Sequence, residues 1–136
     1  MQITRETDYA IRCVYYLAGR RAEVIMTGDI AKSTIIPKSF LAKILQRLEK
    51  AKLVKSYRGV KGGFRLAKKP REINLFDVIK AIEGPIALNR CTSSKKRCAS
   101  NNTCSVHPVW FELRQMVEKR LKKSDFASLI RSRGRS

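Results

Sequence analysis

The stretch from Leu53 to Ala67 reads LVKSYRGVKGGFRLA and decides the fold. Residues 53–57 and 64–67 carry strand-forming side chains, and the glycine-rich segment 58–63 between them is typical of a hairpin turn. The rest of the chain has mainly helical periodicity. The sequence therefore predicts a mainly α fold that carries one small β-hairpin.

Three amphipathic helices are predicted upstream of the hairpin. The first begins near Thr4 and ends at Gly19, the second covers residues 28–34, and the third covers residues 38–50. A helix, a short helix, a turn, a third helix and a hairpin follow one another in a winged helix-turn-helix. We therefore assign residues 1–72 to a winged helix-turn-helix DNA-binding domain.

Four segments are predicted downstream of this domain. Residues 73–87 form a connecting helix and residues 88–107 a cysteine-bearing loop. Residues 108–123 carry a long amphipathic stripe, which favours a dimerisation helix because such a stripe often packs on a second chain. Residues 124–136 are interpreted as a basic C-terminal tail.

The charge of the chain limits its partners. The 136 residues include 30 basic and 11 acidic side chains, for a formal net charge of +19. Such an excess attracts polyanions, and double-stranded DNA is the leading candidate over an anionic membrane surface or a ribosomal role. No apolar run is long enough to span a membrane, and the first residues do not resemble a signal peptide. We expect a cytoplasmic protein with no membrane partner.

Helix-turn-helix proteins read base edges with the start of their second helix. Here the start of the second helix of the motif is the start of the third predicted helix, so its side chains are the candidates for base contacts. An arginine later in the same helix is better placed for phosphate, and two basic residues flank the hairpin tip. Arginine is favoured where a minor groove is narrow. The candidate base-contacting residues are Lys38, Ser39, Ala42 and Lys43, the phosphate contact is Arg47, and the hairpin residues are Arg58 and Lys61.

Three of the four cysteines lie close together, in the pattern Cys91-x6-Cys98-x5-Cys104-x2-His107. Thiolates are soft ligands for zinc and for iron–sulfur clusters, and His107 is a candidate fourth ligand. The gaps are wider than those of a zinc knuckle, which favours a bulkier cofactor. The fourth cysteine, Cys13, lies on an apolar helical stripe and is interpreted as a buried core residue.

These patterns together resemble the Rrf2 family of winged-helix regulators. The most specific part is Arg58-Gly59-x-x-Gly62-Gly63-Phe64-x-Leu66-Ala67, and the segment from Asp77 to Gly84 is also similar to the family. The resemblance covers residues 1 to 125. It implies a homodimer formed through the helix at 108–122, an approximately palindromic DNA operator, and Arg58 as the wing residue that enters the minor groove.

The resemblance also implies a redox-sensitive iron–sulfur cluster on Cys91, Cys98 and Cys104, and a regulator, interpreted as a repressor, that senses cluster, redox or nitric-oxide status. In the IscR-like branch a histidine at the position of His107 completes a 2Fe–2S cluster. In the NsrR-like branch an aspartate of the partner subunit, here matched by Asp8, completes a 4Fe–4S cluster. We prefer His107 and 2Fe–2S, although the first gap is x6 where IscR-like members commonly have x5.

Two other classes of function remain as alternatives. A zinc-stabilised nucleic-acid-binding protein with no sensory role would use the same cysteines. An enzyme is not expected, because the sequence has no paired carboxylates in a polar setting, no phosphate-binding glycine loop and a single histidine. No small-molecule substrate is expected either.

Overall fold

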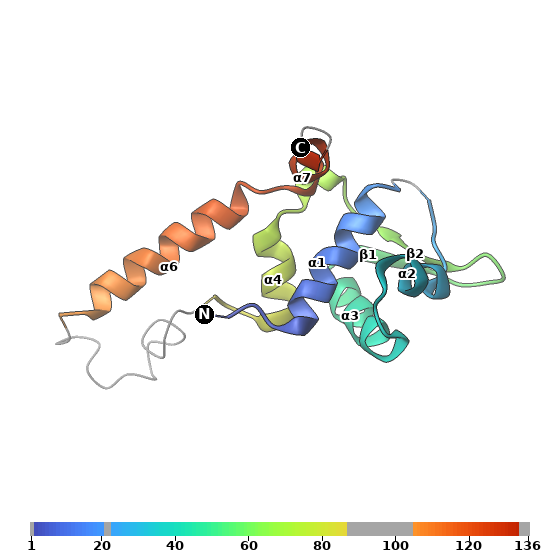
Figure 1. Cartoon of the computed structure of the whole chain (residues 1–136), viewed down its shortest axis with the longest axis horizontal. Helices are drawn as coiled ribbons and strands as arrows, with labels where there is room; N and C mark the ends of the chain where they lie inside the picture. The colour runs from blue at the N-terminus through green and yellow to red at the C-terminus, as the bar shows by residue number, and fades with distance from the viewer. Residues whose placement is uncertain (1, 21–22, 87–104, 134–136) are drawn as a thin grey trace.

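The computed structural model describes residues 2–20, 23–86 and 105–133 (Figure 1). Over these ranges the chain is mainly helical and carries one small antiparallel sheet, as the sequence predicts. The elements, in chain order, are α1 (Arg5–Ala18), α2 (Thr27–Thr34), α3 (Lys38–Lys50), β1 (Val54–Tyr57), β2 (Gly63–Leu66), the 3-10 turn η1 (Pro70–Glu72), α4 (Leu75–Glu83), α6 (His107–Lys122) and α7 (Phe126–Arg133).

Helix α1 is the central element of the core. The hydroxyl of Thr4 accepts a hydrogen bond from the Thr7 backbone N–H and so caps the first turn. Its buried face carries Ala10, Cys13 and Leu17 at helical spacing, and this face packs against α3, α4 and α7. The prediction that Cys13 is a core residue is confirmed. Its burial raises the pKa of the thiol to about 12.

Helices α2 and α3 form the helix-turn-helix. Helix α2 begins at Thr27, one residue before the predicted start, and its cap residue Met26 makes no side-chain capping bond. Helix α3 has the predicted bounds and buries one apolar stripe. The stripe consists of Leu41, Ile44, Leu45 and Leu48. Each leucine or isoleucine buried in this way contributes about 1.5–3 kcal/mol, so the stripe fixes which face of α3 is left for solvent.

The wing is the hairpin of β1 and β2, in which Val54 pairs with Leu66 and Tyr57 with Gly63. Phe64 also exchanges two backbone hydrogen bonds of 2.9 Å with Ile25, which lies before α2. A Cβ atom on Gly63 would stand 2.1 Å from the Ile25 carbonyl oxygen, so only glycine allows this pairing. The wing is therefore attached by its backbone to the helix-turn-helix.

Helix α4 begins with a reciprocal cap. The Asn74 side chain accepts from the Asp77 N–H at 2.8 Å, and the Asp77 carboxylate accepts from the Asn74 N–H at 3.1 Å. Within residues 73–87, the segment predicted to form a connecting helix, the helix itself covers Leu75–Glu83 and ends at Gly84. Helix α4 then packs between α1, α3 and α6.

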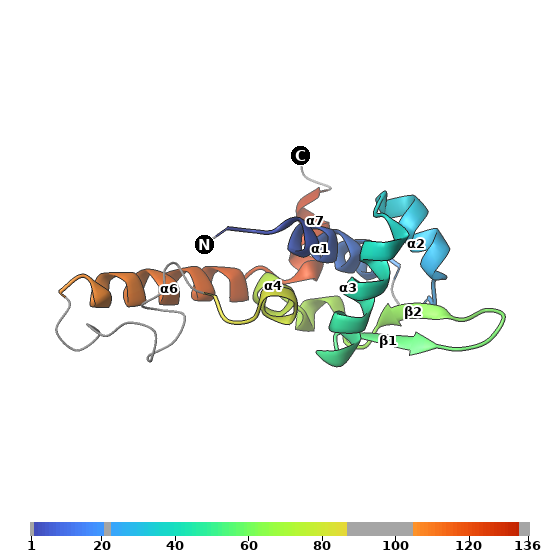
Figure 2. The ribbon, with the colours of Figure 1, turned by 90° about the horizontal axis from the view of Figure 1, so that it is seen from below.

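Helix α6 extends away from the body of the molecule in both views (Figures 1 and 2). Among the described elements it contacts mainly α4, and it has no buried residue. Several of its large apolar side chains are exposed: Val109, Trp110, Phe111, Leu113 and Met116. None of the described helices is long and apolar enough to cross a membrane.

The expected basic tail over residues 124–136 is corrected for residues 126–133, which form helix α7. Phe126 is fully buried, and its N–H donates to the Ile73 carbonyl at 3.0 Å. Leu129 and Ile130 also pack on the core. The basic side chains of this segment suggested a solvated tail, whereas the i, i+3, i+4 apolar spacing from Phe126 determines the structure.

Candidate nucleic-acid interface and metal centre

The outer face of α3 is exposed and is available to enter a groove of DNA. Lys38, Ser39, Ala42 and Lys43 are all exposed, opposite the buried leucine stripe. Helix α3 and the hairpin of β1 and β2 lie next to each other, with the hairpin tip projecting beyond the helix (Figure 2). An α-helix fits the major groove of B-DNA, and a neighbouring wing then reaches the adjacent backbone or minor groove.

Gln46 extends this face and was missed by the sequence reasoning. It is exposed and lies three and four residues after Lys43 and Ala42, which places the three side chains on one helical face. A glutamine amide can form two hydrogen bonds with an adenine edge. The helical period alone would have identified Gln46.

The wing tip presents Arg58, Val60 and Lys61 to solvent, and Val60 is 96% exposed. Gly59 adopts a φ of +112°, which favours glycine and turns the chain at the tip. On the hairpin itself, the guanidinium of Arg65 lies 5.2 Å from the centre of the Tyr57 ring. The tip therefore combines exposed positive charge with a turn that its glycine permits.

Arg47 has intramolecular partners that the sequence did not predict. Its guanidinium donates to the Glu6 carboxylate at 2.9 Å and to the Ile82 carbonyl at 3.4 Å. These bonds connect α3 to α1 and α4. A guanidinium has five N–H donors, so a phosphate contact by Arg47 would use the donors that remain.

His107 is the first residue of α6, and it is the member of the predicted Cys91, Cys98, Cys104 and His107 set that lies among the described residues. Its ring is half-buried and packs on Phe111, with ring centroids 6.4 Å apart. Its Nδ1 atom is buried and has no hydrogen-bond partner within the described part of the chain. A buried imidazole nitrogen without a partner is uncommon, and an imidazole nitrogen is a suitable ligand for iron or zinc.

The three loop cysteines, Cys91, Cys98 and Cys104, lie outside the described residues. Among the residues that are described, no group of three His, Cys, Asp or Glu side chains could hold a metal ion. Asp8, the alternative ligand, is on α1 with its side chain 61% exposed, and it pairs with Arg12 at 3.1 Å. Asp8 therefore has a charged partner on its own helix, whereas Nδ1 of His107 has no hydrogen-bond partner among the described residues.

The exposed side of α6 carries an apolar hollow of about 320 Å³. Its lining combines four apolar side chains with the stem of one arginine: Leu113, Met116, Val117, Arg120 and Leu121. Monomeric proteins seldom leave an apolar surface of this kind uncovered. We call this part of α6 the apolar strip.

A helix-turn-helix with an attached wing defines the class of protein: this chain is a DNA-binding transcription regulator. Residues 3–132 match the Rrf2 family, described as an iron-dependent transcriptional regulator, and the chain belongs to that family. The prediction from the wing motif is confirmed, and so is the prediction that the chain is not an enzyme, because the family and its relatives are transcription regulators.

Individual relatives support the same assignment. The chain is 36% identical over 110 residues to the transcriptional regulator NsrR of Bacillus licheniformis, covering 80% of this chain and 73% of that one. In fold it is similar to CymR, the global cysteine regulator of B. subtilis, with a TM-score of 0.79, 24% identity and 95% of each chain covered. It is also similar to T. potens IscR, with a TM-score of 0.77, 23% identity, and 97% and 88% covered.

Proposed function

We propose that this chain is a homodimeric, sequence-specific repressor whose DNA binding responds to an iron–sulfur cluster on Cys91, Cys98, Cys104 and His107. The preferred cluster is 2Fe–2S. The alternative is 4Fe–4S with the partner subunit's Asp8 in place of His107. A cluster supplies a centre whose redox state or loss reports iron, redox or nitric-oxide status. Because a regulator acts where the DNA is, we place the protein in the cytoplasm.

The observation that carries the cluster proposal is the buried Nδ1 atom of His107, which has no hydrogen-bond partner among the described residues. His107 follows Cys104 by three residues and begins α6. Coordination of a metal by this nitrogen would give it the partner that it otherwise lacks. Phe111, one turn later, packs on the ring and restricts its orientation.

The homodimer proposal is supported by α6, whose apolar side chains are exposed and which has no buried residue. A second copy of α6 would cover this strip. Since His107 begins the same helix, a change at the cluster would reach the dimer contact directly. The spacing of the two recognition helices would then depend on cluster state.

The DNA contacts we propose are Lys38, Ser39, Ala42 and Lys43 at base edges, Arg47 at phosphate, and Arg58 and Lys61 at the wing tip. This assignment is supported by the exposure of all seven residues, which lie on α3 or at the wing tip. We add Gln46 to the base-reading set.

Anaerobic purification with optical and Mössbauer spectra tests the cluster and its fourth ligand. We expect a brown protein with a 2Fe–2S signature, lost or altered in His107→Ala and retained in Asp8→Ala. Asp29→Ala, which removes an exposed aspartate elsewhere, is the matched control for Asp8→Ala. A colourless protein with one zinc per chain would instead establish the zinc-stabilised alternative. A 4Fe–4S spectrum that depends on Asp8 would establish the other cluster.

Sedimentation velocity tests the dimer. Leu113→Glu and Met116→Glu place charges on the exposed apolar strip and should each convert dimers to folded monomers. Lys119→Glu changes an exposed charge on the same helix and should leave the dimer intact. Dimers that persist in both strip variants would contradict the assignment of α6.

In transcription assays a repressor lowers transcript from a promoter that contains its operator, and an increase would reverse the proposed sign.

A further inference from the structure

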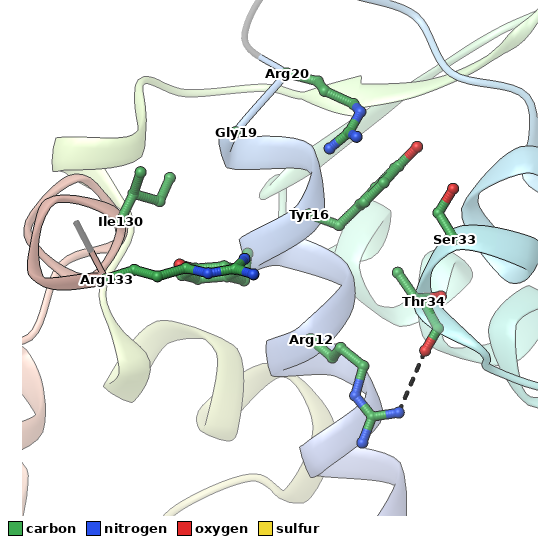
Figure 3. A pocket seen from close by; sticks show the side chains of 9 residues that line it. Arg12, Tyr16, Gly19, Arg20, Ser33, Thr34, Ile130 and Arg133 are labelled. Atoms are coloured by element: carbon green, nitrogen blue, oxygen red, sulfur yellow. Dashed lines mark hydrogen bonds between the residues drawn. The ribbon is translucent and has the colours of Figure 1, made fainter. Parts of the chain in front are cut away.

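A second cavity lies away from the outer face of α3 and has no role in the proposed function. It measures about 600 Å³, which is within the size range of small-molecule sites. It lies over α1, between α2 on one side and α7 on the other (Figure 3). Its lining residues are Arg12, Tyr15, Tyr16, Gly19, Arg20, Ser33, Thr34, Ile130 and Arg133, and we call it the three-helix pocket.

The lining of the three-helix pocket is strongly positive. Its described lining contains three arginines and no acidic side chain, and one of these arginines, Arg12, pairs with Asp8 on the α1 surface. Arg12 also donates to the Thr34 carbonyl at 3.3 Å, which holds its guanidinium between α1 and α2. Guanidinium groups fixed in this way are suited to carboxylate and phosphate because they bind both through paired hydrogen bonds.

The pocket also has flat apolar walls. Tyr15 and Tyr16 are half-buried, and the Arg20 guanidinium lies 3.9 Å from the centre of the Tyr16 ring. The Ile130 side chain adds an aliphatic surface from α7. Planar rings stack on tyrosine and on arginine. A bare phosphate ion would fill only a small part of this volume, so the walls favour a larger ligand.

We propose that the three-helix pocket binds a small organic anion that combines a carboxylate or phosphate group with a planar ring. The guanidinium groups hold the anionic group, and the Tyr16 ring contacts the planar part. Ser33 and Thr34 end α2, so an occupant touches the helix-turn-helix itself. The ligand is an effector and not a substrate.

Isothermal titration of the full chain, purified without oxygen and held at constant ionic strength, tests the proposal with three probes. Phenyl phosphate carries both parts of the proposed ligand, inorganic phosphate only the charge, and phenol only the ring. We expect phenyl phosphate to bind at least about tenfold more tightly than either fragment. Equal affinity for phenyl phosphate and inorganic phosphate would overturn the proposal, because the ring would then contribute nothing.

Variants locate the binding. Arg20→Gln removes one charge from the pocket, and Ser33→Trp fills its volume without a change of charge. Each should weaken phenyl phosphate binding by about tenfold. Arg5→Gln removes an exposed charge at the start of α1, outside the pocket, and should leave the affinity within about twofold. Binding that survives both pocket variants would place the anion elsewhere on this basic chain and contradict the site.

The phosphate backbone of DNA is the other anion that the three-helix pocket could bind. A short nonspecific DNA duplex should leave phenyl phosphate binding unchanged, and Arg20→Gln and Ser33→Trp should leave affinity for that duplex unchanged. If the duplex displaces phenyl phosphate and both variants weaken DNA binding, the pocket is a backbone contact and the small-anion proposal fails.

Discussion

The guanidinium of Arg47 on the recognition helix α3 bonds the carboxylate of Glu6 in the first turn of α1 at 2.9 Å. The same guanidinium reaches the Ile82 carbonyl near the end of α4. Three helices therefore meet at one side chain. The basic residue that the sequence assigned to phosphate also fixes the recognition helix on its scaffold.

A double-mutant cycle on Arg47→Ala and Glu6→Ala should show this connection. Both side chains are about half exposed, so water screens the pair. We expect a coupling of about 0.2–1 kcal/mol in the free energy of unfolding by urea. Arg47→Ala should cost more than Glu6→Ala because it also loses the Ile82 bond. Strictly additive effects would show that the pair contributes nothing to stability.

Lys43→Ala and Arg58→Ala should each weaken operator binding and leave the melting temperature unchanged, since both side chains are exposed. Lys123→Ala, an exposed lysine just after α6, is the control and should bind normally. We expect losses of about 1–3 kcal/mol for a base-edge contact. Fluorescence anisotropy over a range of salt measures them. Unchanged affinity in both variants would refute the docking of α3 and the wing.

Ile35→Gly should stabilise the fold. Ile35 ends α2 with φ +57° and ψ +44°, a left-handed conformation that is unfavourable for a β-branched residue, and it is 82% exposed. Glycine relieves the strain and loses little burial, so we expect a gain of about 1 kcal/mol. Val60→Gly is the control, because Val60 is also a highly exposed β-branched residue but has no positive φ. A thermal melt that falls in Ile35→Gly would contradict this reading.

Asp125→Ala should destabilise α7 by about 1 kcal/mol. The Asp125 carboxylate accepts from the Ser128 N–H at 2.8 Å and so caps the helix. That bond lowers the pKa of Asp125. Because the folded protein favours the ionised carboxylate, Asp125 stabilises the fold at pH values above the ordinary carboxyl pKa. This contribution is lost as the pH falls through the lowered pKa of the folded protein. Asp125→Asn keeps a cap without the titration. The stability difference between wild type and Asp125→Asn should shrink as the pH falls below the ordinary carboxyl range, and a constant difference would exclude the effect.

The winged helix-turn-helix could be predicted because local signals agree along its length. The leucine stripe of α3 has the helical period, Asn74 and Asp77 form a local cap, and the glycines after Arg58 mark the hairpin. Each of these is short-range chemistry. The pairing of Phe64 with Ile25 is not, since it joins residues far apart in the sequence.

The remaining features depend on tertiary contacts. Helix α7 was missed because its basic side chains obscured the apolar spacing from Phe126, which is buried and whose N–H donates to the distant Ile73 carbonyl. The Arg47–Glu6 pair joins residues 41 positions apart, and no local pattern indicates it. The three-helix pocket likewise requires α1, α2 and α7 to be assembled.

The central claim is that cluster state controls DNA binding, and operator affinity of cluster-loaded and cluster-free protein measures it most directly. Both forms should be prepared without oxygen and titrated against the same labelled operator at the same salt. We expect the affinities to differ by about fivefold or more, in the range of a two-state coupling, and the difference to disappear in His107→Ala. Identical binding curves for the two forms of the wild type would contradict the account.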